Sequence, residues 1–571
     1  MSAIAPRIPV RSLLTFVFLS AIIASVLWPL VAFDWWAGYE SIRYQLRLDA
    51  LATNLLAQGT HPRWIPETAG GYGTPYFNFY APGFTYLCLP FIWLGVHVAV
   101  KAAIVLVTAV GTFSVYSLAR EWNGRAAGCL AVLLFTTCPY LLFCLYVRTA
   151  LAEYAALHLA AAMVWVFWTV SKSGVPWRGV ILASCAYACW FTLHNVSSLF
   201  LSLLFVLVVA GFAWRHGLKG RALLRLLLIF PLGALLSAWF WLPAVLELPD
   251  VQHQVLRAGI FDPLANLNHG WGYFLRPSRS EASFGPWMTL ALLACLAGAA
   301  VNRIARGPVL VLCLPACLML LMTYSVASLI WQHVPLISFV QFPWRLTGGA
   351  SLLVALAASY LLACPMNATA PQDGAMPPGR AWAVVLGVAA CLCALWAVSL
   401  SAIVQEPIVS QELRLSHWDR LRGTLHPSGD VLTAGEFLPA TSDYRQTPEF
   451  DGDVLKTAPA PAHAIRLGAE FLLAGAGPAE GPLVLKQYWW PCWRAEINGS
   501  QVPTRAGPGG CLEVDVGHNP DWPAHPLRVW AARTPLEAFS EWVSGLAWLA
   551  VFVTFCVLNW RARQARAGAG S

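Results

Sequence analysis

The feature that most constrains this 571-residue chain is a succession of apolar runs, separated by short polar loops. A helix of about 20 apolar residues crosses a hydrocarbon core of about 30 Å, and many of these runs reach that length. Hydrophobic residues make up 58% of the chain and charged residues 11%, whereas soluble domains carry about 25% charged residues. We therefore expect an all-α polytopic membrane protein with about 12 transmembrane helices. The expected spans are 13–33, 101–119, 126–146, 154–171, 178–193, 197–214, 224–246, 287–302, 307–326, 346–364, 381–402 and 537–559.

The segment 82–97 is apolar but short. Whether it crosses the membrane determines on which side every later loop lies. If it does not cross, nearly all short basic loops fall on one side, as the excess of Lys and Arg in cytoplasmic loops requires. We therefore expect 82–97 to be an interfacial or re-entrant helix, with both termini cytoplasmic. No small-residue cleavage site follows 13–33, so this run is expected to be a retained anchor rather than a signal peptide.

The outward-facing segments on this topology include a long stretch of different composition near the C-terminus. It alternates apolar and polar residues, as in Leu483-Val-Leu-Lys, and such a period of two predicts a small extracytoplasmic β domain. The net charge of +8 fits the Arg-rich loops, and no basic patch interleaved with aromatic residues indicates nucleic acid. The expected parts are a transmembrane body at 1–402 with outer loops 34–81 and 247–286, a β-rich domain at 403–536, and a last helix with a basic cytoplasmic tail at 537–571.

The cysteines mostly lie within apolar runs, where cysteine behaves as a small hydrophobe. Only Cys492 and Cys511 fall in the polar C-terminal region. A disulfide Cys492–Cys511 can form there if the region faces an oxidising compartment.

The first outer loop carries a carboxylate, a phenol and a guanidinium at Glu40, Tyr44 and Arg47. The spacing i, i+4, i+7 places them on one face of a helix over 40–57 whose leucines lie on another face. Such a helix can lie on a membrane surface and hold a metal ion, a phosphate or a sugar. The alternative is a solvated polar face without a ligand.

Two further ionisable groups, Arg148 and Glu153, lie beside hydrocarbon in the turn between two spans. Charges in such places are costly and therefore indicate function, although an intrahelical or snorkelling pair is an equal alternative. Arg345, in Gln341-Phe-Pro-Trp-Arg345, can bind phosphate with its planar guanidinium or snorkel to the interface. His194 lies at an outer helix break, where packing or a hydrogen-bonded cap is the more frequent role.

A glycine-rich aromatic stretch at 70–80 combines a freely folding backbone with flat aromatic faces that suit a sugar ring or an acyl chain. The alternative is an aromatic anchor at the membrane interface. In the 247–286 loop, Arg276, Arg279 and Glu281 are candidates for lid contacts. The candidate groove residues are Arg63, Trp64, Tyr72, Tyr76, Asn78 and Tyr80, together with Tyr44, His194 and Gln341.

These motifs resemble a known group of bacterial membrane proteins. Pro62-Arg63-Trp64, the stretch 71–80 and 341–345 are similar to the multi-pass proteins labelled 6-pyruvoyl-tetrahydropterin synthase-related and to YfhO-type proteins. Both groups resemble the GT-C superfamily of polyprenyl-phosphate-sugar-dependent glycosyltransferases. The resemblance implies a GT-C-like membrane body in the bacterial cytoplasmic (inner) membrane.

The resemblance also implies roles for particular residues. Glu40 and Glu153 match the acidic catalytic positions, and Glu40 can hold a divalent metal, Mg or Mn. Arg47, Arg148 and Arg345 would bind the phosphate of a polyprenyl-phosphate sugar donor, whose sugar passes to an extracytoplasmic glycan, lipid or protein acceptor. Related sequences usually carry Asp and His where this chain has Glu40 and Tyr44. This departure favours a non-catalytic scaffold for envelope polysaccharide assembly as one alternative. A lipid or glycolipid transporter is another, although the chain lacks paired halves with broken helices.

Overall fold

The computed structural model describes two compact units, each built from segments far apart in the sequence. The first comprises Met1–Ser41, Pro90–Gly233 and Ile260–Ser410, and the second Ile42–Leu89, Ala234–Gly259 and Gln411–Ser571. The expected boundaries at 402 and 536 stay a prediction. The described residues are 10–32, 38, 40–276, 282–334, 337–362, 379–389, 392, 437–443, 445–448, 450, 453, 463–474, 481–517 and 519–568.

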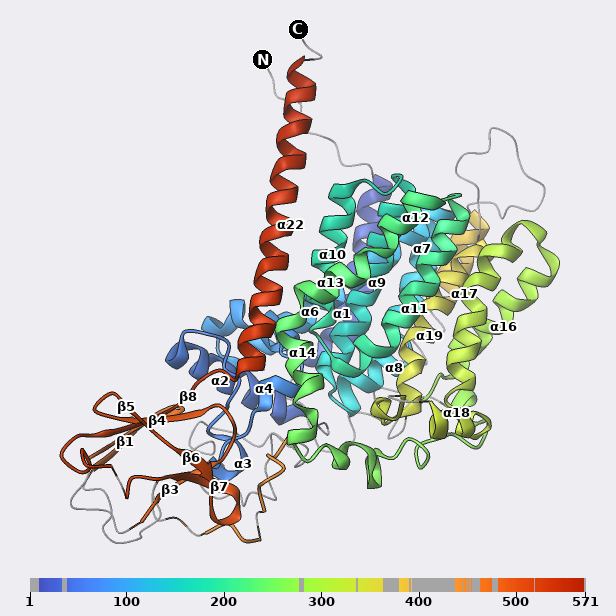
Figure 1. The fold of residues 1–571 in the computed structure, drawn as a ribbon. Coiled ribbons are helices and arrows are strands. Elements are labelled where there is room, and N and C mark those ends of the chain that lie inside the picture. Colours follow the sequence, from blue (N-terminus) through green and yellow to red (C-terminus); the bar gives the residue numbers. More distant parts are fainter. Residues whose placement is uncertain are drawn as a thin grey trace. The chain divides into compact units, whose positions relative to one another are not determined.

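The first unit is a helical bundle (Figure 1). Its helices in chain order are α1 (Val10–Ala32), α6 (Val96–Asn123), α7 (Arg125–Thr136), α8 (Pro139–Leu142), the π-helix η2 (Phe143–Val147), α9 (Leu151–Lys172), α10 (Trp177–Phe191), α11 (Asn195–Arg215), α12 (Gly220–Leu227), α13 (Ile229–Leu236), α15 (Gly272–Leu275), α16 (Pro286–Val301), α17 (Arg303–Leu321), α18 (Ser328–His333), η7 (Ile337–Val340), η8 (Pro343–Arg345) and α19 (Leu346–Ala358). The last residues of α13 belong to the second unit.

Glycines let the central helices of this bundle approach closely. A Cβ added at Gly111 of α6 would lie 2.8 Å from the Cβ of His158 on α9. On the same helix, Leu157 would meet a Cβ at Gly348 of α19 at 2.5 Å. Small residues at helix contacts are the usual means by which membrane helices associate. The buried helix α9 is therefore fixed by close contacts with α6 and α19.

The length and hydropathy of the helices make this a multi-pass membrane protein. Among the described residues, six helices are long and apolar enough to cross a bilayer, and two bent pairs raise the number to eight. This is fewer than the expected number of about 12. The difference arises partly because 178–193 forms a helix of 15 residues, while 287–302 and 307–326 also form short apolar helices. The expected span 381–402 is described only at 381–389 and 392, and the rest of it lies outside the described residues. The expected spans 126–146 and 224–246 are bent by 44° and 71° at internal breaks.

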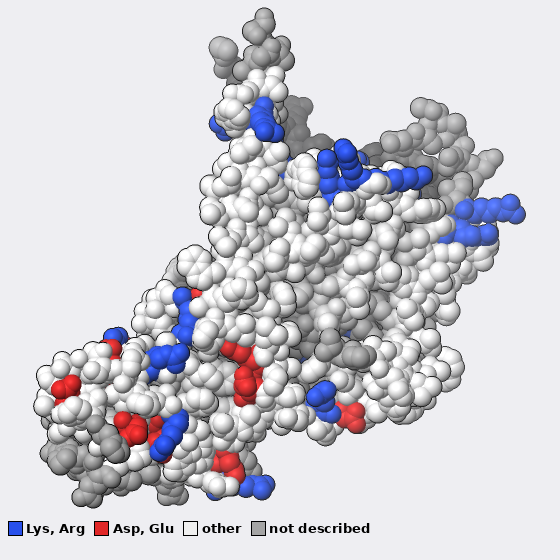
Figure 2. Space-filling view, viewed as in Figure 1, with Lys and Arg blue, Asp and Glu red and all other residues white. Residues whose placement is uncertain are grey.

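Basic side chains gather at one end of the first unit, where Figure 2 shows Lys and Arg beside a largely uncharged surface. The loops before α10 and α12 lie at this end in Figure 1, and these loops and the adjoining helix ends carry Lys172, Arg178, Arg215, Lys219 and Arg221. The expected orientation of these basic residues toward the cytoplasm stays a prediction. The segment 82–97 contains the short apolar helix Gly83–Leu94, below the roughly 17 residues that crossing needs.

The second unit contains the antiparallel β region expected near the C-terminus. Its sheets have the strand orders β1-β2-β8-β4-β5 and β3-β7-β6. The strands are β1 (His463–Leu467), β2 (Glu470–Ala474), β3 (Leu483–Tyr488), β4 (Trp493–Ile497), β5 (Ser500–Val502), β6 (Thr504–Ala506), β7 (Cys511–Val514) and β8 (Leu527–Ala531). The helices of this unit are α2 (Ser41–Gln58, from Ile42), α3 (Thr68–Gly71), α4 (Tyr76–Phe79), α5 (Gly83–Cys88), α14 (Ala238–Leu246) and α22 (Pro535–Gly568).

Burial alternates along β4, whereas in β3, which contains the predicted Leu483-Val-Leu-Lys, every side chain except Lys486 is buried. Along β4, the side chains of Trp493, Ala495 and Ile497 are buried, and the two between them are partly exposed. Ala495 pairs with Val529 of β8, which is also buried. Successive side chains point to opposite faces of a sheet, so one face of β4 forms the core.

The glycine-rich aromatic stretch packs into this core. The indole Nε1 of Trp64 donates a 2.7 Å hydrogen bond to Gln487 of β3, and the ring of Tyr72 stacks on Tyr488 at 5.2 Å. Gly73 has φ +76°, and a Cβ there would lie 2.5 Å from Gln487 Oε1. Glycine is needed at this position because the backbone is left-handed and another chain segment is close.

A candidate carboxylate and guanidinium site

Irregular backbone positions the first two candidate side chains. The π-helix η2 ends at Val147, directly before Arg148, and α9 begins at Leu151. Between them, Thr149 has φ +55°. A β-branched residue in this region is an outlier, and both π-helical turns and backbone strain concentrate at functional sites. The turn therefore has backbone features that are typical of functional sites and are not needed for a simple connection.

Glu153 is the centre of the site and has no exposed surface. Its Oε2 accepts a 2.5 Å hydrogen bond from Arg148 Nη1 and lies 3.4 Å from Arg345 Nε. The hydroxyl of Tyr140 donates to Oε1. Glu153 also lies in the first turn of α9, where the helix dipole favours a negative charge. One buried carboxylate is thus held by two guanidinium groups and a phenol.

Arg345 is fixed where η8 leads into α19. Its Nη1 donates to the carbonyl oxygen of Val340 at 2.9 Å and to Gln341 Oε1 at 3.0 Å. Gln341 has φ +64°, a second left-handed residue next to the cluster. The predicted motif 341–345 therefore contributes its guanidinium to the same site as Arg148 and Glu153.

Aromatic faces complete the surroundings of both arginines. The guanidinium of Arg148 lies 5.1 Å from the ring centre of Trp344 and 5.4 Å from that of Phe342. Arg345 lies 5.0 Å from the Phe342 ring centre. Such contacts attract a cation to the negative face of the ring. They hold the guanidinium groups in place beside the carboxylate.

Glu40 is the more accessible carboxylate of the cluster. Its Oε1 lies 4.0 Å from Arg148 Nη2, and its side chain is 22% exposed against 8% for Arg148 and 0% for Glu153. Its backbone N–H donates to the carbonyl oxygen of Arg148 at 3.2 Å. A Cβ at Gly38 would clash with Thr149 Oγ1, so this segment lies directly against the turn. Glu40, Arg148, Glu153 and Arg345 thus form one cluster within the first unit.

The donor set does not fit the divalent metal considered for Glu40. Oxygen donors from several carboxylates usually hold Mg²⁺ or Mn²⁺. Here the Glu40 carboxylate lies 4.0 Å from the Arg148 guanidinium, and Glu153 is already bound by Arg148 and Arg345. Within the described part of the chain, no group of three or more His, Cys, Asp or Glu residues could hold a metal ion.

Tyr44 and Arg47 lie in the second unit, whereas Glu40 lies in the first. Arg47 donates a 2.7 Å hydrogen bond to the Tyr80 hydroxyl and lies 4.0 Å from the Tyr80 ring centre. The predicted helix is confirmed as α2, but its polar face is not solvated. Tyr44 and Arg47 are as buried as Leu48, because the aromatic rings and the hydroxyl satisfy the guanidinium.

The remaining predicted residues have various surroundings. His194 caps α11 by accepting from the N–H of Ser197, which agrees with the cap alternative. Tyr72, Tyr76 and Asn78 are buried. Arg276 is exposed, while Arg279 and Glu281 lie outside the described residues.

Cys492 and Cys511 are both free thiols, so the disulfide considered between them is not formed. Cys511 starts β7, and Cys492 precedes β4 in the other sheet.

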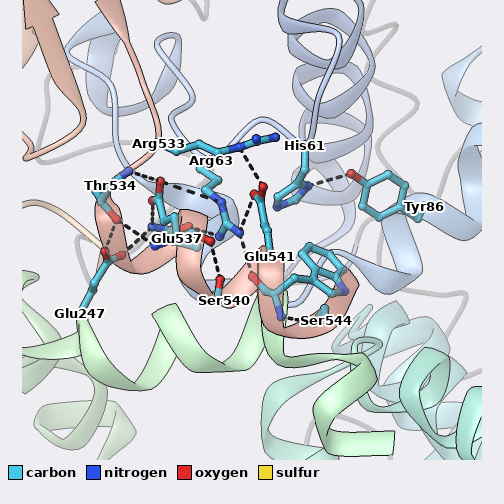
Figure 3. Close-up of polar contacts among 12 residues, drawn as sticks. His61, Arg63, Tyr86, Glu247, Arg533, Thr534, Glu537, Ser540, Glu541 and Ser544 are labelled. Carbon is cyan, nitrogen blue, oxygen red and sulfur yellow. Dashed lines mark hydrogen bonds and ion pairs between the residues drawn. The ribbon is translucent and has the colours of Figure 1, made fainter. Parts of the chain in front are cut away.

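A second polar cluster, in the second unit, contains the predicted residues Arg63 and Asn78 together with Glu247 and Glu537, which were missed from the sequence (Figure 3). Arg63 Nη1 donates to Asn78 Oδ1 at 2.7 Å, and Asn78 Nδ2 donates to Glu247 Oε2 at 2.9 Å and Glu537 Oε1 at 2.6 Å. Burial, opposed by a hydrogen bond from Thr534 and reinforced by the charge of Glu537, raises the pKa of Glu247 to about 7.

The start of α22 had a signal for this cluster. Thr534 Oγ1 accepts from the N–H of Glu537, and Glu537 Oε2 accepts from the N–H of Thr534 at 2.8 Å. This is a capping box, recognisable as Thr followed three positions later by Glu before an apolar run. Tyr140, also missed, had a weaker signal: a tyrosine within an apolar span needs a polar partner.

Comparison with known proteins gives matches only among solved structures. No protein-family model and no curated protein matches the chain. The crystal structure of ArnT from Cupriavidus metallidurans bound to undecaprenyl phosphate is 15% identical, with a TM-score of 0.40, over 71% of this chain and 68% of that one. The apo oligosaccharyltransferase of Archaeoglobus fulgidus is 14% identical, with a TM-score of 0.41, over 74% and 61%. Similarity at this level assigns no activity.

Proposed function

We propose that this chain is a membrane glycosyltransferase that moves a sugar from a polyprenyl-phosphate-linked donor to an extracytoplasmic acceptor. The observation that carries the proposal is the position of the partly exposed carboxylate of Glu40 beside the Arg148 guanidinium, which Glu153 links to Arg345. A base beside fixed cations is what transfer from a phosphate leaving group requires. The sequence resemblance to the GT-C superfamily supports the same reaction class.

In this proposal, Glu40 accepts the proton of the acceptor hydroxyl. The hydroxyl oxygen forms a bond to the anomeric carbon as the bond between that carbon and the phosphate oxygen breaks. The electron pair of the broken bond stays on the phosphate, which Arg148 and Arg345 bind. Glu153 fixes the two guanidinium groups. The product is the acceptor glycan, lipid or protein with the sugar covalently attached.

The charge balance of the cluster suits this step. Two guanidinium groups face two carboxylates before the reaction, so the four side chains are close to neutral. When Glu40 takes up the proton, the cluster gains one positive charge as the leaving phosphate gains negative charge. Fixed charges that match the transition state contribute most in a site shielded from water. The donor phosphate therefore needs both arginines in place.

The proposed setting is the bacterial inner membrane with the basic loops and both termini cytoplasmic, as the positive-inside rule favours. The apolar body would hold the lipid part of the donor.

The principal alternative is a non-catalytic scaffold on the same body. One observation favours it: Glu153 is fully buried and already bound by Arg148, Arg345 and Tyr140, so this part of the cluster can act as a structural ion network. A scaffold would tolerate changes at the accessible Glu40 without loss of function.

The test is a screen of polyprenyl-phosphate sugars on the full chain in lipid nanodiscs, measuring release of the carrier phosphate. Arg345→Lys keeps the charge but loses the planar fork that matches phosphate oxygens, so we expect at least a tenfold loss of release. Arg303→Lys, at the exposed first residue of α17, is the matched control and should release at the wild-type rate. Absence of release by the wild type with every donor would contradict the proposal.

A further inference from the structure

The second unit contains a pocket that the proposed reaction does not use. It is lined by residues from the end of α2, the loop after it, the turn before β4 and the start of α22. The pocket has a volume of about 50 Å³. Arg63 and Trp64, expected from the sequence to line a substrate groove, form part of its wall together with Trp490 and Glu537.

Four side chains of this wall carry polar atoms without a hydrogen-bond partner among the described residues. These atoms are Gln58 Nε2, His61 Nε2, Arg63 Nε and Trp490 Nε1. Arg63 is only 6% exposed and Trp490 only 2%. Unpaired buried polar groups are rare because each costs about 1–3 kcal/mol. Their concentration around one pocket indicates that a molecule with hydrogen-bonding groups belongs there.

The charges around the pocket are nearly balanced (Figure 3). Arg63 Nη2 lies 3.1 Å from Glu541, and Arg533 Nε lies 3.0 Å from the other oxygen of the same carboxylate. Arg63 Nε also lies 4.0 Å from Glu537. Two guanidinium groups thus face two carboxylates, which leaves little net charge to attract an anion.

His61 adds a neutral hydrogen-bonding group to the wall. Its Nδ1 pairs with the Tyr86 hydroxyl at 2.7 Å. Burial, together with the positive charge of Arg63, lowers the pKa of His61 to about 3, so the ring is uncharged at pH 7. The pocket therefore offers neutral and balanced groups beside two indole rings.

We propose that this pocket binds the hydroxyl-bearing edge of an uncharged sugar residue. Each sugar hydroxyl both donates and accepts, so it can pair with the donors Gln58, Arg63 and Trp490 and with the acceptor Glu537. A water molecule takes up about 30 Å³, so the volume admits one or two hydroxyl groups, with the rest of the ring at the mouth beside exposed Thr60. The binding needs no donor lipid and stands apart from the transfer reaction.

The experiment uses the full chain in nanodiscs and ligand-observed NMR. The probes are the methyl glycosides of glucose, galactose, mannose and N-acetylglucosamine, with glucuronate and glycerol for comparison. Trp490→Phe keeps a ring but removes the N–H, and Gln58→Met keeps the length but removes the amide. We expect each to weaken binding of the preferred glycoside at least fivefold. The controls are Trp542→Phe and Gln501→Met, at exposed positions on α22 and β5.

Saturable binding of one neutral glycoside, weakened by both pocket variants and by neither control, is the expected result. Three results would overturn the proposal: no glycoside binds, glucuronate or glycerol binds as tightly, or the pocket variants bind like the wild type. Gln58 is only partly buried, so Gln58→Met keeps the test valid if Trp490→Phe lowers the folded yield. Glycoside binding without any sugar transfer would support this site while the transferase proposal fails.

Discussion

Arg148 and Glu153 are joined by a 2.5 Å hydrogen bond from Nη1 to Oε2, with the strained residue Thr149 between them in the chain. This pair connects Glu40 on one side with Arg345 on the other. Its removal tests whether the cluster is a built unit.

Glu153→Ala should lower the free energy of unfolding by about 3–5 kcal/mol, because it leaves the buried Arg345 without its counter-charge and Arg148 with only the more distant Glu40. The matched control is Glu121→Ala. Glu121 pairs with Lys172 at side-chain exposures of 34% and 58%, and such a pair contributes about 1 kcal/mol or less. Thermal unfolding in detergent measures both. Equal losses of stability in the two variants would show that the cluster stabilises the fold no more than an exposed ion pair does.

The pKa of Glu247 predicts a pH dependence of stability. The folded-state pKa, about 7, lies above the ordinary value of 4.5, so between these pH values the folded state binds more protons than the unfolded state. The contribution of Glu247 to the free energy of unfolding is therefore largest below about pH 4.5 and is lost as the pH rises through 7. Glu247→Gln should flatten the dependence between pH 5 and 8, as melting temperatures would show. Glu470→Gln, in an exposed pair with Arg528, is the control and should leave the slope unchanged.

Thr534→Ala should destabilise the second unit by about 1–3 kcal/mol. The substitution removes the helix cap, a contribution of about 1 kcal/mol, and also the 2.7 Å hydrogen bond from Thr534 to Glu247. Thr534→Ser retains both contacts and should cost little. If serine and alanine destabilise equally in chemical unfolding, the hydroxyl has no role.

Gly73→Ala should destabilise the chain by more than the roughly 1 kcal/mol expected for a left-handed glycine alone. An added Cβ would lie 2.5 Å from Gln487 Oε1 and 2.6 Å from Trp64 Nε1, so it would disrupt their hydrogen bond. Gly59→Ala is the matched control, since Gly59 has φ +67° but nothing within 4 Å of its added Cβ. Similar melting temperatures for both variants would show that the backbone angle alone matters.

Much of the fold follows from periodicity in the sequence. The apolar run expected at 154–171 is α9, Leu151–Lys172, and the alternation at 483–486 is part of β3. Both patterns are local, so a single segment contains the information. Among the described residues, fewer helices than expected reach the spanning length, because hydropathy does not show where a helix such as α10 ends early or where α13 and α14 bend.

The candidate site was predictable only in part. Arg148 and Glu153 were visible as charges beside hydrocarbon, and Arg345 through its motif. The contact of Asn78 with Glu537 joins residues 459 positions apart, and no local pattern indicates such a pair. The alternative of a solvated face at Arg47 is wrong, and sequence spacing cannot show that Tyr80 covers the guanidinium.

The most direct measurement of the central claim is sugar transfer by Glu40→Gln beside wild type, with the donor that the screen identifies. Removal of a general base costs about 10²–10⁴ in rate, so transfer should fall at least 100-fold. Binding of the polyprenyl phosphate should stay within about twofold, since both arginines remain. Transfer by Glu40→Gln at the wild-type rate would contradict the account and favour the scaffold.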